Sequence, residues 1–351
     1  MRWAMLRQPQ PTAYILLSLR VHPNTMPAAI VQRWFVVVNP HAGGGKGHRH
    51  WPRIRAELER AGLSFEFALT EFRHHALQIT QDAIKQGFRH FVAVGGDGTF
   101  NEVVNGMFGQ TSVPTSSFRL AVVAVGTGND WPRMYAHPRS YQQQVQAIAD
   151  GHWVWQDVGV AEYCDAGATK TRYFVNSAGC GFEADVVDCT NRLKDAGRKG
   201  ALLYMLALLR TLAAHRSAHM HVLVDGQLKA SCSTFSLTAG IGRYTGGGMR
   251  QAPFALPNDG LFDTTIIQRM SKLRVALNLP RLYNGTLLNH PKITGERGQQ
   301  VHIESQPPVS IEADGESLGL TPITLSTKPL SLAVMVSRAF AEGQQNTFSG
   351  Q

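Results

Sequence analysis

The residues best placed to do chemistry are Gly95, Gly96, Asp97, Gly98 and Thr99, a run of three glycines with one carboxylate. They follow an apolar segment at 88–94, which predicts a strand, and precede apolar residues at helical spacing over 101–107. Glycines at such a turn let backbone amides approach an anion, and the helix N-terminus adds partial positive charge. Because Asp97 would repel phosphate unless a cation lay between them, the run predicts a nucleotide phosphate site with Mg²⁺. The alternative is an ordinary turn in which Asp97 or Thr99 caps the helix.

A second group of carboxylates, Glu312, Asp314 and Glu316, lies at the end of an alternating segment over 311–316. Phosphoryl transfer needs loops that hold a triphosphate, Mg²⁺ that bridges its β and γ oxygens, and a base near the acceptor hydroxyl. These carboxylates could supply the base. The competing interpretation is a surface β-turn with solvated acids.

The composition favours a globular chain with room for two domains, since it has 351 residues, of which 43% are hydrophobic. The longest apolar segments, at 13–19 and 201–209, are shorter than the roughly 18 residues that cross a bilayer. The four cysteines show neither C-x-x-C pairing nor zinc spacing, so we expect free thiols in a reducing cytoplasm.

The formal charge is +9, and three of the bases, Arg2, Arg7 and Arg20, precede Met26. Residues 1–31 are interpreted as a disordered extension, or as the product of a start codon placed too early with Met26 as the true start. The remaining basic balance suits anionic partners such as ATP or acidic lipid headgroups. A nucleic-acid partner is not expected, because no stripe of lysine and arginine interleaved with aromatic residues is present.

The first half of the chain alternates predicted strands and helices. Strands are expected at 34–38, 64–69, 88–94 and 120–125, and helices at 51–61, 74–86 and 101–107. The loop at 39–47 is glycine-rich but is not a Walker A loop, because Pro40 stands where the first glycine should be. This alternation predicts a parallel sheet covered on both faces, with the site at the carboxyl ends of its strands.

The second half, from about residue 157, is dominated by short β-rich segments at 173–177, 219–224, 234–239, 264–268, 301–303 and 309–313. They favour an antiparallel sandwich or barrel. One helical exception, at 191–215, begins with the basic residues Arg192, Lys194, Arg198 and Lys199. Two interpretations are open for it: a helix packed on its own sheet, or a helix lying at a membrane interface.

Several motifs occur in a fixed order along the chain. They are Asn39-Pro40 with its glycine tail, the run from Gly95 to Glu102, the loop from Gly126 to Asp130 with Arg133, and Asp314-Gly315-Glu316; segments 173–182 and 246–261 accompany them. Together, from about Arg33 to Phe340, they resemble the diacylglycerol kinase catalytic family, which includes sphingosine and ceramide kinases and soluble bacterial lipid kinases.

The resemblance implies an α/β fold with an N-terminal nucleotide-binding domain of the phosphofructokinase type and a C-terminal β-sandwich lipid domain. The first would span 32–156 and a returning segment at 322–341, the second 157–321, and a tail 342–351. The active site would lie between the two domains. The function that the resemblance implies is ATP- and Mg²⁺-dependent transfer of a γ-phosphate to a diacylglycerol-like, phosphatidylglycerol or sphingoid lipid. The protein would associate peripherally with a membrane to reach that lipid.

The resemblance also assigns residues. ATP would be surrounded by Asn39, Pro40, Gly43, Gly44, Gly45, Lys46, Thr70, Gly95, Gly96, Asp97, Gly98, Thr99, Asn101, Glu102, Gly126, Thr127 and Asn129. Asp97, Asp314 and Glu316 would be catalytic, with either Asp314 or Glu316 as the base. A structural Mg²⁺ would bind Asp259 and the backbone carbonyls of Leu256 and Leu261, the alternative there being a plain Asn-Asp-Gly turn.

Other functions remain as alternatives. An NAD kinase or a phosphofructokinase-like sugar kinase would share the glycine run, although the Gly126–Asp130 loop and the late Asp-Gly-Glu oppose both. An inactive lipid-binding module of the same fold is opposed by the joint presence of Asp97, Glu102, Asp314 and Glu316. The identity of the acceptor lipid and the oligomeric state stay open.

Overall fold

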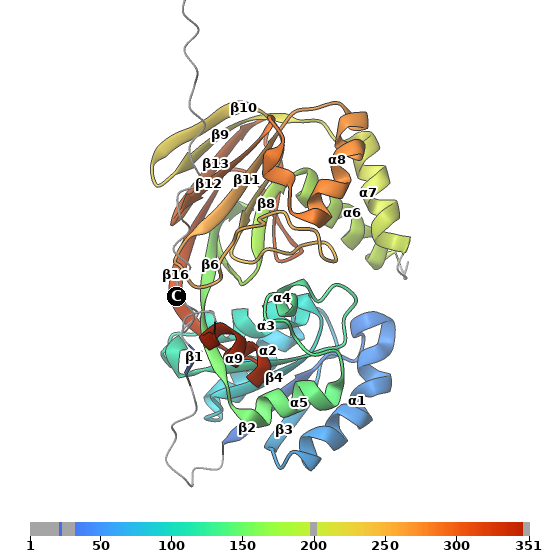
Figure 1. The fold of residues 1–351 in the computed structure, drawn as a ribbon, viewed down its shortest axis with the longest axis vertical. Helices are drawn as coiled ribbons and strands as arrows, with labels where there is room; N and C mark the ends of the chain where they lie inside the picture. Colours follow the sequence, from blue (N-terminus) through green and yellow to red (C-terminus); the bar gives the residue numbers. More distant parts are fainter. Residues whose placement is uncertain (1–20, 23–31, 197–201, 347–351) are drawn as a thin grey trace, which may run out of the picture.

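A parallel sheet forms the first unit of the computed structural model, which describes residues 21–22, 32–196 and 202–346 (Figure 1). Its strands lie in the order β3-β2-β4-β5-β16, and every neighbouring pair is parallel. Their bounds are β2 Arg33–Val38, β3 Ser64–Leu69, β4 His90–Gly95, β5 Arg119–Ala124 and β16 Ile323–Met335.

Helices cover both faces of this sheet. α1 (Ala42–Arg60) and α5 (Tyr141–Asp150) pack on one face, and α2 (His75–Lys85) and α3 (Asp97–Phe108) pack on the other. Successive strand residues point to opposite faces, so Val36 contributes to the core with Ile54 of α1 while Val37 contributes to the core with Phe100 of α3. Strands buried on both faces are therefore continuously apolar rather than alternating.

The second unit is antiparallel and encloses one core between its strands. The cluster includes Phe174, Leu237, Phe262 and Ile303, which come from four different strands. The strands are β6 Trp153–Asp165, β7 Ala168–Phe174, β8 Ser177–Gly181, β9 Ala218–Val224, β10 Gln227–Gly240, β11 Phe262–Gln268, β12 Ile293–Gly298, β13 Gln300–Gln306, β14 Ser310–Ala313 and β15 Glu316–Leu320.

Two long strands, β6 and β16, join the units (Figure 1). They pair antiparallel along most of their length, with a register shift between Lys328 and Leu332. β16 pairs with β13 in the second unit and with β5 in the first. At the shift, the buried Asp157 of β6 accepts hydrogen bonds from the backbone N–H groups of Leu330 (2.7 Å) and Gly260 (2.6 Å).

Three helices pack beside the strands of the second unit, on the side opposite β16 (Figure 1). They are α6 (Phe182–Asp195), α7 (Leu202–Ala214) and α8 (Lys272–Asn284). The remaining described elements are α4 (Asp130–Arg133), α9 (Arg338–Asn346), two 3₁₀ turns at Thr115–Ser117 and Leu287–Asn289, and β1 (Val21–His22), which pairs with β6. Within the described part of the chain, no helix is both long and apolar enough to span a membrane.

The predicted fold class is confirmed: an α/β first unit precedes a β-sandwich-like second unit. Three local predictions are wrong. The strand expected at 173–177 is broken, because β7 ends at Phe174 and β8 begins at Ser177. The single helix expected at 191–215 is two helices, α6 and α7. Helical structure in the second half is also more extensive than expected, since α8 was not foreseen.

Some predictions fall where the structure describes little or nothing. Apart from β1, the predicted extension over 1–31 lies outside the described residues, as do Arg198 and Lys199 of the basic cluster and residues 347–351 of the tail. All four cysteines are described, and all are free thiols as expected.

Candidate active site

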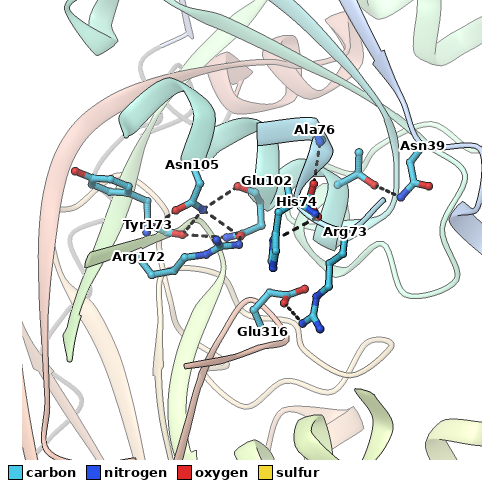
Figure 2. A network of polar contacts seen from close by, with 11 residues as sticks. Asn39, Arg73, His74, Ala76, Glu102, Asn105, Arg172, Tyr173 and Glu316 are labelled. Atoms are coloured by element: carbon cyan, nitrogen blue, oxygen red, sulfur yellow. Dashed lines mark hydrogen bonds and ion pairs between the residues drawn. The ribbon is translucent and has the colours of Figure 1, made fainter. Parts of the chain in front are cut away.

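The loops after β2, β4 and β5 meet at the carboxyl edge of the parallel sheet. Asn39, which follows β2, donates a hydrogen bond from Nδ2 to Oγ1 of Thr99 in the first turn of α3, at 2.9 Å (Figure 2). The backbone N–H of Asn39 also donates to the carbonyl of Val94 in β4, at 2.9 Å. The predicted Asn39 and Thr99 motifs are thus in direct contact.

Glycine is required where these loops touch. Gly43, Gly44 and Gly45 have φ values of 60°, 70° and 88°, so the start of α1 is a left-handed turn, the conformation that favours glycine. A Cβ on Gly43 would lie 2.2 Å from the carbonyl oxygen of Val125, and one on Gly126 would lie 2.7 Å from Cα of Gly96. Side chains at these positions would push the three loops apart.

An open pocket of about 770 Å³ lies beside the glycine turn. Thr70, at the end of β3, is buried at its edge, and Arg49, His41 and His48 give the lining a basic character. The lining residues are Pro40, His41, Gly45, His48, Arg49, Leu69, Thr70 and Glu71. Lys46 and Thr127, both assigned to the nucleotide by sequence, are exposed and do not line this pocket.

Asp97, which is half-buried, and Asp130, which is buried, form a close pair of carboxylates. A Cβ on Gly128 would lie 3.2 Å from Oδ2 of Asp97 and 3.4 Å from Oδ2 of Asp130, so both side chains converge on this loop. Burial, and secondly the charge of Asp130, raise the pKa of Asp97 to about 6. Burial also raises the pKa of Asp130, although Gly247 N–H donates to its Oδ2 at 2.7 Å.

This pair fits a divalent cation by its chemistry. Oδ1 of Asp130 is buried without a hydrogen-bond partner, with Nε of Arg133 3.7 Å away, and two converging carboxylates are the hard oxygen donors that Mg²⁺ prefers. Within residues 32–196 and 202–346 there is no group of three or more His, Cys, Asp or Glu side chains that could hold a metal ion. A cation between Asp97 and Asp130 would therefore need further oxygen ligands from water, backbone or a bound phosphate.

Glu102 has a structural task. Its Oε1 accepts a hydrogen bond from the backbone N–H of His74 at 3.0 Å, and its Oε2 accepts one from Ala76 at 3.1 Å (Figure 2). The carboxylate thus caps the N-terminus of α2 from another helix, where a negative charge is favourable. Burial nevertheless raises the pKa of Glu102.

Asp314 and Gly315 form the two-residue turn between β14 and β15, with φ values of 48° and 81°. The turn is not a solvated corner, because the Asp314 carboxylate folds inward. Its Oδ1 accepts hydrogen bonds from the backbone N–H groups of Asn176 and Ser177, both at 3.0 Å. Its Oδ2 accepts from Val175 N–H at 2.8 Å and from Asn101 Nδ2 at 2.9 Å.

Glu316, two residues later, faces the first unit instead. Its Oε2 accepts a hydrogen bond from Nη2 of Arg73, in the connection between β3 and α2, at 2.5 Å (Figure 2). Its Oε1 lies 4.0 Å from the position that a Cβ on Gly98 would occupy, at the N-terminus of α3. The side chain keeps 19% of its surface exposed. The structure therefore brings Glu316 and the glycine run together.

Polar side chains of α3 bind the two units to each other. Asn101 and Asn105 both donate from Nδ2 to the carbonyl of Tyr173, at 3.0 and 2.8 Å, and Arg172 Nη2 donates to Oδ1 of Asn101 at 2.6 Å (Figure 2). Asn101, assigned to the nucleotide by sequence, thus contacts Asp314 and β7. Arg73, Asp130 and Arg172 were missed; Asp130 belongs to a motif that the sequence displays, whereas nothing local distinguishes the two arginines.

An apolar pocket of about 80 Å³ lies between the helices and the strands of the second unit. Glu183 of α6 is its acidic member; burial raises the pKa of this side chain to about 8, and its Oε1 has no hydrogen-bond partner. Burial, and secondly the charge of the neighbouring Glu183, raise the pKa of Glu312 in β14, and its Oε2 accepts a hydrogen bond from Gly315 N–H at 2.8 Å. The pocket is lined by Phe182, Glu183, Val186, Leu208, Phe235, Ser236, Met249, Gln251, Ile267, Met270, Val275, Asn278, Leu279, Leu282, Leu287 and Ile293.

The second predicted cation site is separate and already contains a positive charge. Asp259 accepts a hydrogen bond from Nη2 of Arg297 in β12, and Arg297 Nε donates to Asp263 Oδ2 at 3.1 Å. The other oxygen of Asp259 accepts from Leu261 N–H at 3.1 Å. The Asp259 side chain is only 2% exposed. Both carboxylate oxygens of Asp259 therefore already have hydrogen-bond partners, and neither is left unpaired to bind a metal ion together with the carbonyls of Leu256 and Leu261.

Two family models match the chain. The diacylglycerol kinase catalytic domain matches residues 33–161, and the YegS C-terminal NAD kinase beta sandwich-like domain matches residues 176–336. Curated relatives cover most of the chain. A diacylglycerol kinase of Bacillus subtilis is 28% identical over 83% of this chain and 92% of its own length, and one of Staphylococcus haemolyticus is 27% identical over 82% and 83%.

Solved structures show the same fold. A diacylglycerol kinase from Bacillus anthracis superposes with a TM-score of 0.66 at 20% identity, covering 88% of this chain and 98% of that one. The yeast NADH kinase complexed with NADH superposes with a TM-score of 0.52 at 10% identity, covering 92% and 89%.

Proposed function

Because the chain belongs to the diacylglycerol kinase catalytic family and is a lipid kinase, we propose that it transfers the γ-phosphate of ATP to a lipid hydroxyl in a Mg²⁺-dependent reaction. The acceptor class is a diacylglycerol-like, phosphatidylglycerol or sphingoid lipid. The observation that carries this proposal is Glu316, a partly exposed carboxylate that faces Gly98 at the N-terminus of α3.

Glu316 acts as the general base. Its position beside the glycine run suits a carboxylate that accepts the proton of the acceptor hydroxyl while the oxygen attacks the γ-phosphorus. The new bond joins the lipid oxygen to phosphorus, the bond between the γ-phosphorus and the β,γ-bridging oxygen breaks, and ADP leaves. Arg73, paired with Glu316 at 2.5 Å, orients the carboxylate and can turn toward the transferred phosphate.

Asp314 is a positioning residue. Both of its oxygens already accept two hydrogen bonds, so it lacks a lone pair directed at substrate. Those bonds fix the Asp314–Gly315 turn, and the turn sets the direction of Glu316. Of the two bases that the sequence left open, we therefore assign the role to Glu316.

The nucleotide lies over the loops after β2, β3, β4 and β5. The open pocket with Thr70 and Arg49 takes the nucleoside end, and the glycine turn at Gly43–Gly45 and the α3 N-terminus hold the phosphates. Asp97 and Asp130 would hold Mg²⁺, and the ion would supply positive charge that neutralises the phosphates. Glu102 acts by fixing α2 and the loop with Arg73, not by touching ATP.

The apolar pocket beneath α7 and α8, at about 80 Å³, takes only a short part of an acyl or alkyl chain of the acceptor. Glu183 lines this pocket, and the neighbouring Glu312 accepts a hydrogen bond from the backbone N–H of Gly315, the residue before Glu316. An apolar pocket of this kind supports a lipid over NAD as acceptor, although the fold is shared with a NADH kinase. We place the reaction on the cytoplasmic side of a membrane, with the enzyme associated peripherally.

The test is a transfer assay with purified protein, ATP labelled at the γ-phosphate, and Mg²⁺. The acceptors are diacylglycerol, phosphatidylglycerol, sphingosine, ceramide and NAD, each offered separately. We expect label in one or more lipids and none in NAD, and no transfer when Mg²⁺ is chelated. Label in NAD alone would replace the lipid assignment, and label in no acceptor would favour an inactive lipid-binding module.

A further inference from the structure

Helix α8 carries an apolar face that nothing in the described structure covers. No residue of α8 is fully buried, and Leu273 and Leu277, one turn apart, are each 70% exposed. The opposite side of the helix, with Val275, Leu279 and Leu282, lines the apolar pocket. α8 is therefore apolar on two sides, one toward the pocket and one toward solvent.

Helix α7 continues this surface. Leu206 and Leu209 are 41% and 57% exposed, whereas Leu208 points into the same apolar pocket. Lys272 at the start of α8 donates a hydrogen bond to the carbonyl of Ala213 at the end of α7, and the two helices lie side by side at one edge of the second unit (Figure 1). We call Leu206, Leu209, Leu273 and Leu277 the leucine patch.

All charged side chains on α7 and α8 are basic. Arg210 lies on α7, and Lys272, Arg274 and Arg281 lie on α8, whereas neither helix contains an Asp or a Glu. Exposed leucines on helices whose only charged side chains are basic match the pattern of helices that lie on anionic membranes, where the apolar face enters the headgroup boundary. A protein partner would need a surface both acidic and apolar, whereas an anionic bilayer offers both properties everywhere.

We propose that α7 and α8 dock onto a bilayer that contains anionic phospholipid, with the leucine patch inserted and the basic side chains at the headgroups. This inference rests on the proposed lipid kinase function, because docking there sets the pocket behind α8 against the membrane that supplies the acceptor. The docked face bears residues that neither line the pocket nor touch the catalytic turn.

Vesicle co-sedimentation tests the surface directly. The probes are phosphatidylcholine vesicles with and without phosphatidylglycerol, at low and high salt. We expect the wild type to sediment with the anionic vesicles, less so at high salt, and Leu273→Ser/Leu277→Ser to bind at least about tenfold more weakly. Leu228→Ser, at an equally accessible leucine (60% exposed) on the β9–β10 hairpin, is the control and should bind as the wild type does.

A second assay separates this surface from catalysis. With a short-chain diacylglycerol dispersed in detergent, the double variant should phosphorylate at the wild-type rate, because the acceptor no longer has to be taken from a bilayer. Vesicle binding by a protein that phosphorylates no lipid would refute the proposed function while still supporting the docking surface. Wild-type-like vesicle binding by the double variant would overturn the proposed docking surface, as would failure of the wild type to bind any vesicle. A wild-type dimer that the two serine substitutions dissociate would also overturn it, because a second copy of the chain would then cover the leucine patch.

Discussion

Two carboxylates, Asp314 and Glu316, lie two residues apart and have different environments. Asp314 is buried with four hydrogen bonds, whereas Glu316 has one charged partner, Arg73, and faces Gly98. Strand alternation does not cause the difference, since both would point to the same side of a regular strand. The positive φ of Asp314 in the turn does, because it directs that side chain back toward residues 175–177.

Glu316→Gln should lower turnover at least about a hundredfold while the protein stays folded, because the amide cannot accept the acceptor proton.

Asp314→Asn should instead lower the free energy of unfolding by about 1–3 kcal/mol, since the amide turns an N–H₂ group toward backbone donors. Turnover and urea unfolding measure the two effects. Glu304→Gln, at an exposed carboxylate of β13, is the control. Glu316→Gln with most of its activity would remove Glu316 from the base role.

The Asp97 carboxyl predicts a pH dependence of stability. Burial raises its pKa from 3.8 to about 6, so between these pH values the folded state binds a proton that the unfolded state has lost. The free energy of unfolding therefore falls as pH rises through this window. Without divalent cations, Asp97→Asn should be more stable than the wild type above pH 6, by about 2–3 kcal/mol, with no difference below pH 4.

Urea unfolding of both proteins at pH 4 and pH 7.5, with EDTA and then with Mg²⁺, checks this prediction. Mg²⁺ should stabilise the wild type and leave Asp97→Asn unchanged, since only the wild type retains both converging carboxylates. Equal stabilisation of the two proteins by Mg²⁺ would mean that Asp97 is not a ligand.

At the scale of elements, the α2 helix depends on a cap from another helix. Glu102 of α3 accepts the N–H groups of His74 and Ala76, and His74 itself has a left-handed φ of 65°. Glu102→Ala should lower the free energy of unfolding by about 1–2 kcal/mol and speed amide exchange at His74 and Ala76. Glu59→Ala, at a half-exposed carboxylate on α1, should change neither quantity appreciably. Unchanged exchange at residues 74–76 would show that the cap does not order α2.

The turn before β11 depends on an internal cation. Arg297 pairs with both Asp259 and Asp263, so Arg297→Met should lower the free energy of unfolding by about 2–3 kcal/mol. Arg55→Met, which breaks a half-exposed pair with Glu59, should lower the free energy of unfolding by less than about 0.5 kcal/mol.

In an Asp97→Asn background, Mg²⁺ should leave the thermal midpoint of unfolding unchanged. A midpoint that rises with Mg²⁺ there would instead support a metal ion at Leu256, Asp259 and Leu261.

Most elements of the first unit could be predicted from sequence because each is locally determined, although α4 and α5 were not predicted. Buried parallel strands are short continuous apolar runs, and β2 ends at Val38, where the pattern over 34–38 predicts. The second unit was harder. The break between β7 and β8 follows from the backbone of residues 175–177 bonding Asp314, far along the chain, and α8 has no single apolar stripe because it is apolar on two sides.

The whole molecule places its candidate site where the two units meet. Arg73 and Glu316 are separated by 243 residues, and Asn101 and Asp314 by 213, yet both pairs are hydrogen-bonded across the junction. β6 and β16 run through both units and keep this junction in register. The motifs of the site were readable in the sequence, but the partners of Glu316, Asp314 and Glu102 were not. Pairings over such separations leave no local pattern.

The central claim is that ATP lies over the loops of the parallel sheet with its γ-phosphate facing Glu316. A crystal structure of the protein with a non-hydrolysable ATP analogue and Mg²⁺ tests it most directly. We expect nucleotide density along Gly43–Gly45, Thr70 and Gly96–Gly98, with the metal between Asp97 and Asp130 and the terminal phosphate toward Glu316. Density elsewhere, or a terminal phosphate directed away from the turn between β14 and β15, would contradict the account.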